Sequence, residues 1–162
     1  MRKVLLLFCI LASCLLWTGC SQKETIPVTE NQFIEAKTNG FGDIVIETDD
    51  ITEIATFVNY EVDGVTIQFI VVRASDGTVR IAFNTCQSCT PSPNAYFVQE
   101  GNYFVCQNCQ TKFLIDEIGL KKGGCNPAPV EEKTESDGVI TIPKDYADSM
   151  KDNFENWNGP TE

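Results

Sequence analysis

Five cysteines in the second half of the chain have the type and spacing of metal ligands. Cys86 and Cys89 form one CxxC pair, Cys106 and Cys109 form a second pair sixteen residues later, and Cys125 follows two glycines. A two-residue gap lets both sulfur atoms of a pair face one ion from a single turn, and two pairs supply four thiolates. Because the chain has no histidine, the site must be all sulfur, or sulfur with oxygen.

This donor chemistry restricts the function. Thiolates select zinc or an iron–sulfur centre, and the absence of imidazole excludes copper–histidine, Rieske and histidine-ligated haem sites. Every mechanism that uses a histidine base is also excluded, so we expect a binding or electron-transfer module rather than an enzyme. Spacing does not separate an iron–sulfur centre from structural zinc. Disulfide bonding is a third interpretation, since exported thiols often oxidise.

Cys125 differs from the other four cysteines because it has no partner at CxxC spacing. Gly123 and Gly124 precede it and permit a close approach of the backbone. We therefore expect Cys125 to be an additional cofactor-binding residue that tunes the site, while Cys86, Cys89, Cys106 and Cys109 anchor the metal.

The first twenty residues predict export and a lipid anchor. Met1–Lys3 is basic, residues 4–17 are almost wholly apolar but too short to span a bilayer comfortably, and small residues precede Cys20. This pattern resembles a bacterial lipobox, in which the cysteine becomes the lipidated first residue. We expect a signal peptide at 1–19, lipidation at Cys20, and a location on the extracytoplasmic face of the cell membrane.

Charge and length suggest one acidic domain on a tether. The 162 residues include 12 Lys and Arg against 23 Asp and Glu, a net charge of −11, so nucleic acid is excluded as a partner. The acidity suits solubility or attraction of a basic redox partner. Residues 20–40 are polar and predict a tether, and residues 41–162 predict a single metal-binding domain.

The pattern of apolar residues predicts an α+β fold that is mainly β. Strands are expected at 43–48, 54–61, 65–73 and 78–83, and Asp-Gly turns join the last three in an antiparallel meander. A hairpin of 95–98 and 102–105 would deliver the second cysteine pair. A strand at 139–142 and a C-terminal helix from Pro143 to about residue 158 complete the fold. Seven residues are expected on one buried face of the meander: Phe57, Ile67, Phe69, Val71, Val79, Ile81 and Phe83.

Several motifs together resemble the FtrD-like membrane iron-sulfur protein family. The similar segments run from about residue 54 to residue 157, and they are Val62–Gly64, Ala82–Cys86 with its CxxC pair, Gly101–Cys109, Ile118–Gly119, Gly123–Pro127 and Phe154–Trp157. The resemblance implies an iron–sulfur cluster held by Cys86, Cys89, Cys106 and Cys109, with Cys125 as a further candidate. It also implies a link to membrane systems that handle iron, and hence an electron carrier that serves a membrane permease or redox partner.

Overall fold

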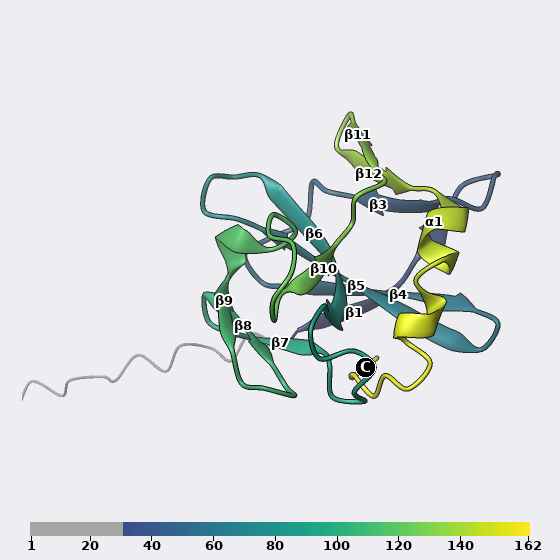
Figure 1. Cartoon of the computed structure of the whole chain (residues 1–162). Coiled ribbons are helices and arrows are strands. Elements are labelled where there is room, and N and C mark those ends of the chain that lie inside the picture. Colours follow the sequence, from purple (N-terminus) through teal and green to yellow (C-terminus); the bar gives the residue numbers. More distant parts are fainter. Residues whose placement is uncertain (1–30) are drawn as a thin grey trace, which may run out of the picture.

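The computed structural model describes residues 31–162, so the predicted signal peptide and Cys20 lie outside the described part of the chain. Figure 1 shows a mainly β domain in which three sheets meet, with one short helix near the C-terminus. The elements are β1 Gln32–Glu35, β2 Lys37–Thr38, β3 Ile44–Glu47, β4 Thr56–Val62, β5 Val65–Arg73, β6 Val79–Cys86, β7 Phe97–Glu100, β8 Tyr103–Cys106, β9 Lys112–Leu114, β10 Pro127–Pro129, β11 Thr134–Ser136, β12 Val139–Ile142, α1 Lys144–Asp148 and the 3₁₀ turns η1 Ile115–Glu117 and η2 Lys151–Asn153.

The central sheet has the order β1-β4-β5-β6-β10 and confirms the predicted meander. Asp63 and Gly64 both have positive φ, 48° and 77°, which suits the two-residue turn between β4 and β5. Gly77, with φ of 82°, lies in the turn that leads to β6. The meander thus delivers the chain to Cys86, the last residue of β6.

Both faces of the central sheet are buried. One core contains Phe69 and Phe83, and the other contains Phe57 and Ile70. The prediction that Phe57 shares a face with Phe69 is therefore wrong: side chains alternate along a strand, and β4 is covered on both sides, so its apolar residues occur on consecutive positions. Four apolar residues that follow Pro143 pack on the first core: Tyr146, Met150, Phe154 and Trp157.

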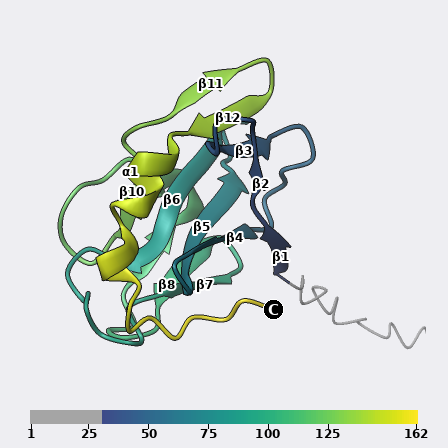
Figure 2. The same cartoon turned by 90° about the vertical axis from the view of Figure 1, so that its right-hand side faces the viewer.

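Two smaller sheets flank the central one. The β7-β8-β9 sheet contains the predicted hairpin and ends β8 at Cys106. The other sheet has the order β11-β12-β3-β2 and forms the upper part of Figure 1. Figure 2 shows α1 lying beside β6, where Tyr146 contacts Phe83 with ring centroids 5.9 Å apart.

Two boundaries differ from prediction. Residues 31–40 contain β1 and β2, so the domain begins before the predicted boundary at 40. β1 pairs parallel to β4, and the rings of Phe33 and Phe57 stack with their centroids 5.1 Å apart. The C-terminal helix is also shorter, because α1 ends at Asp148 and is followed by η2. Within residues 31–162, no helix has the length and apolar character needed to cross a membrane.

Candidate metal centre

The first cysteine pair lies on a tight turn at the end of β6. The backbone N–H groups of Cys89 and Thr90 both donate to the carbonyl of Cys86, at 3.2 and 3.0 Å. The Thr90 hydroxyl donates to the same carbonyl at 2.8 Å. These bonds close the turn, so that both sulfur atoms face the same side.

The second pair repeats this construction at the end of β8. The N–H of Gln110 donates to the carbonyl of Cys106 at 2.8 Å. Gln110 closes the turn in the left-handed region with φ of 61°, at the position where such turns often have glycine. The N–H of Cys106 donates to the carbonyl of Thr111 at 3.0 Å, which ties the far side of the turn back to the strand.

A short segment just before β7 joins the two turns. The carbonyl of Ala95 accepts the N–H of Cys86, and the carbonyl of Tyr96 accepts the N–H of Gln107, both at 2.8 Å. Each turn is therefore attached to the same piece of backbone. This explains how cysteines on different sheets keep a fixed separation.

Cys125 reaches the site on the loop before β10. Gly123 and Gly124 have φ of 75° and 72°, values that favour glycine. Gln87, which lies inside the first pair, holds this loop: its Oε1 accepts the N–H of Gly123 at 2.8 Å, and its Nε2 donates to the carbonyls of Lys121 and Pro127 at 3.3 and 3.2 Å.

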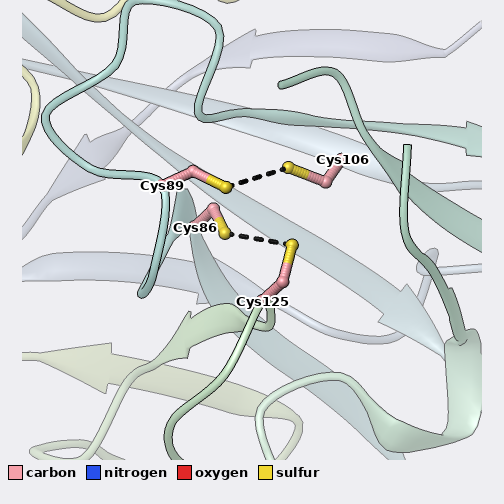
Figure 3. A group of neighbouring side chains, drawn as sticks. All are labelled: Cys86, Cys89, Cys106 and Cys125. Carbon is pink, nitrogen blue, oxygen red and sulfur yellow. Dashed lines mark hydrogen bonds between the residues drawn. The ribbon is translucent and has the colours of Figure 1, made fainter. Parts of the chain in front are cut away.

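Four sulfur atoms converge on one point. The Sγ atoms of Cys86, Cys89, Cys106 and Cys125 all lie within 4.8 Å of one another. Figure 3 shows them facing inward in two pairs, with Cys86 3.3 Å from Cys125 and Cys89 3.9 Å from Cys106. Cys86 and Cys106 are buried, and Cys89 and Cys125 are half-buried. Cys109 is exposed and lies outside this group, with its Sγ 2.7 Å from that of Cys125.

The surroundings shift the pKa values of the thiols in opposite directions. Burial raises the pKa of Cys106 to about 12, against the opposing effect of the N–H groups of Cys109 and Asn108. Burial also raises the pKa of Cys125 and Cys89. Partial burial acts in the same direction on Cys109, but hydrogen bonds with Cys125 and Thr111 outweigh it and lower the pKa of Cys109 to about 6. Binding of a metal must therefore displace protons from the buried thiols.

The donor set fits a thiolate-bound metal. A tetrahedral ion with metal–sulfur bonds of about 2.3 Å places its ligand sulfurs about 3.8 Å apart. The Cys86–Cys125 and Cys89–Cys106 separations, 3.3 and 3.9 Å, lie on either side of that value. No histidine or carboxylate belongs to the group of four, so the ligands are those that zinc and iron–sulfur centres use.

The structure brings together the five cysteines expected at the site, but CxxC spacing does not predict which four of them form the tight group. Cys125 lies inside the tight group and Cys109 at its edge. Sequence reasoning missed Gln87, whose position between two cysteines was the only signal of a role. Cys20 lies outside residues 31–162.

Comparisons with known proteins give one finding. Searches of curated proteins and of solved structures return no match. A family described as "Membrane iron-sulfur containing protein FtrD-like" matches residues 51–154. This range covers most of the chain and includes both cysteine pairs, Cys125 and the strands that position them. The chain therefore belongs to the FtrD-like family of membrane iron–sulfur proteins.

Proposed function

We propose that this chain is a lipid-anchored, extracytoplasmic iron–sulfur protein that carries electrons for a metal-handling membrane partner. Four thiols converge, with that of Cys109 at their edge, from the ends of β6 and β8 and from the loop before β10, and this observation carries the proposal. Four thiolates drawn from these cysteines would hold the centre, which supplies one-electron chemistry when bound. Membership of an iron–sulfur family supports the identity of the cofactor.

The protein's own contribution is to shape the potential of the centre. Hydrogen bonds from the backbone N–H groups of Cys109 and Asn108 oppose the rise in the pKa of Cys106 that burial causes, and the side chain of Asn108 opposes the corresponding rise at Cys89. Such hydrogen bonds stabilise negative charge on sulfur and favour the reduced state. The exposed side at Cys109 leaves one edge of the site open to a partner.

Attachment to a membrane completes the proposed role. A lipid on Cys20 would keep the domain near its partner, which raises the local concentration of that partner, so weak and rapidly reversible contacts suffice. With a net charge of −11, the protein favours a basic docking surface. Electron transfer should then slow as salt is added, because screening weakens this attraction.

The test is metal analysis of anaerobically purified full-length protein, combined with optical spectroscopy during reduction and reoxidation. We expect bound iron and an absorption band that bleaches reversibly. Replacing Cys86 and Cys106 together with serine should abolish both signals. A colourless wild-type protein without iron would contradict the electron-carrier function.

Structural zinc is the second candidate, and the spacing of the sulfur atoms favours it. Separations of 3.3 and 3.9 Å suit a single ion, whereas a cluster core would place irons and sulfides between the thiolates. One zinc per chain with no change on reduction would support this function. Removal of that zinc by a chelator should then unfold the domain, since binding and folding are coupled.

A further inference from the structure

Cys109 and Cys125 differ in burial and in whether they belong to the group of four sulfur atoms. Cys125 is half-buried and belongs to it, whereas Cys109 is exposed and touches only its outer edge. Their Sγ atoms are 2.7 Å apart, which is longer than the S–S bond of about 2.05 Å but close enough for a small movement to join them. CxxC spacing alone would have given these two cysteines the reverse roles.

We propose that Cys125, not Cys109, completes the thiolate shell, and that Cys109 is the solvent-side thiol that withdraws Cys125 from the metal by forming a disulfide with it. This inference rests on the proposed metal binding and adds a means of control. Cys86, Cys89 and Cys106 remain as three ligands, which bind the metal more weakly than four.

The neighbouring contacts explain why this pair, rather than another, is suited to exchange. Cys109 lies in the turn that Gln110 closes, Thr111 Oγ1 is 3.2 Å from its sulfur, and it is the only exposed one of the five described cysteines. An oxidant from solvent therefore meets Cys109 first. Because the Sγ atoms of Cys125 and Cys109 are already 2.7 Å apart, joining them requires only a small shift of either side chain.

The chemistry is thiol–disulfide exchange with a low-molecular-weight disulfide, RSSR, as the oxidant. The sulfur of Cys109 attacks one sulfur of RSSR, the S–S bond breaks, and the first RS⁻ leaves and takes up a proton. This leaves a mixed disulfide between Cys109 and SR; the sulfur of Cys125, which would no longer be available to a bound metal, attacks the sulfur of Cys109, the bond between Cys109 and SR breaks, and the second RS⁻ leaves and takes a proton from water. Two electrons pass from the protein sulfurs to RSSR, and the products are one protein disulfide and two RSH.

Differential alkylation of the wild-type full-length protein tests the ligand assignment without any variant. The protein is loaded with zinc, treated briefly with iodoacetamide, and mapped by mass spectrometry. We expect modification of Cys109 and protection of Cys125, Cys86, Cys89 and Cys106. Protection of Cys109 with modification of Cys125 would overturn the assignment. If the wild type binds no zinc, cobalt or iron at all, the proposed function itself fails.

Cobalt(II) then compares the two matched variants, because its absorption reports the number of thiolate ligands. Cys109→Ser should keep the four-thiolate spectrum of the wild type. Cys125→Ser should lose it and bind metal more than about 100-fold more weakly, beyond the 10–100-fold typical of an outer-shell partner. Loss of the four-thiolate spectrum in Cys109→Ser would contradict the proposal even if Cys125→Ser failed to fold.

Oxidised glutathione, added to zinc-loaded protein, tests the exchange. The wild type should release zinc and yield a Cys109–Cys125 disulfide in the peptide map, and dithiothreitol should restore binding. Cys109→Ser should release zinc at least about tenfold more slowly, because the first attacking sulfur is missing. Equal release rates, or a disulfide between other cysteines, would overturn the proposed role of Cys109.

Discussion

Gln87 links the first cysteine turn to the loop that carries Cys125. Its side chain makes three hydrogen bonds to that loop, and its own N–H donates to the carbonyl of Asn126 at 3.0 Å. The corresponding residue of the second turn, Gln107, instead donates to Val105 of its own hairpin at 3.1 Å. The two turns are thus alike in backbone but differ in what their first intervening residue holds.

We therefore predict that Gln87→Ala weakens metal binding by about 10–100-fold, as outer-shell partners typically do. The loop of Cys125 loses its attachment while all five thiols remain. Zinc affinity, measured by competition with a chromophoric chelator, is the readout, and Gln107→Ala is the matched control. Equal effects of the two substitutions would show that the loop is held by other contacts.

The sequence predicts which cysteines belong to the site but not the position of each one within it. CxxC spacing predicts that both pairs face one site, because each pair is constrained by its own turn; the structure places Cys86, Cys89 and Cys106 in one group and Cys109 at its edge. The position of Cys125 depends on contacts with Gln87, which lies 36 residues from Gly123. Long-range contacts of this kind leave no local pattern.

At the scale of elements, the turn after η1 is held close to β6. Gly119 has φ of 72°, and a Cβ added there would lie 2.3 Å from the carbonyl oxygen of Ile81. Only glycine lets the chain pass this strand on its way to Cys125. Gly77 provides a comparison, because its φ is 82° but a Cβ would meet nothing within 4 Å.

Gly119→Ala should consequently destabilise the protein more than Gly77→Ala. Both substitutions carry the cost of a left-handed residue, about 1–2 kcal/mol, but only Gly119→Ala also displaces backbone. Denaturant unfolding of both variants measures the difference in the free energy of unfolding, which we expect to exceed about 1 kcal/mol. Similar losses would indicate that the loop shifts freely away from β6.

Helix α1 is fastened to the central sheet through Asp148. Its Oδ1 accepts the Tyr60 hydroxyl at 2.8 Å, and Lys144 pairs with Oδ2. Burial would raise the pKa of Asp148, but hydrogen bonds from Lys144 and Tyr60 outweigh it and hold the pKa below the ordinary value of 3.8. The ionised carboxylate therefore stabilises the folded state above pH 3.8, and this contribution is lost as the pH falls through the lowered pKa.

Asp148→Asn should reduce the free energy of unfolding by about 1 kcal/mol at neutral pH, the net value of a hydrogen bond. The difference from wild type should shrink as the pH falls below 3.8, since the wild-type carboxylate then becomes protonated. Urea unfolding at several pH values measures it, with Asp145→Asn, on the exposed side of α1, as control. A difference that does not change with pH would argue against the charge as its cause.

Strand prediction succeeded where a turn signal bounded an alternating or apolar run, as for β4 and β5 around Asp63-Gly64. It failed for β1 and β10. β1 pairs parallel to β4, so no hairpin turn in the sequence indicates it. β10 has proline at both ends of its three residues, and proline argues against a strand. Both strands form because they pair with the free edge of a neighbouring strand, and such pairing depends on the tertiary structure.

At the scale of the whole molecule, a chain of buried amides joins the C-terminal segment to the metal centre. Asn59 Oδ1 accepts Gln68 Nε2, and Gln68 Oε1 accepts Asn84 Nδ2, both at 2.7 Å. In the middle of this series, Gln68 also donates to the carbonyl of Pro160 at 2.8 Å. At one end, Asn84 Oδ1 accepts the N–H of Phe97 at 2.7 Å. Gln68 and Asn84 are fully buried, so each of these bonds replaces water that cannot enter.

Among the hydrogen-bonded buried amides, Asn84 is the one that connects the series to both cysteine turns. It stands two residues before Cys86, and its partner Phe97 follows the segment that accepts N–H groups from both turns. Asn84→Ala would leave Gln68 Oε1 and the N–H of Phe97 buried without partners, each at about 1–3 kcal/mol. We expect a loss of about 2–5 kcal/mol in the free energy of unfolding, together with faster hydrogen exchange at Phe97. The control is Asn94→Ala, at an exposed position of the same loop region. Unchanged exchange at Phe97 would show that pairing of β7 with β8 alone protects this N–H, whereas faster exchange would show that the bond to Asn84 protects it.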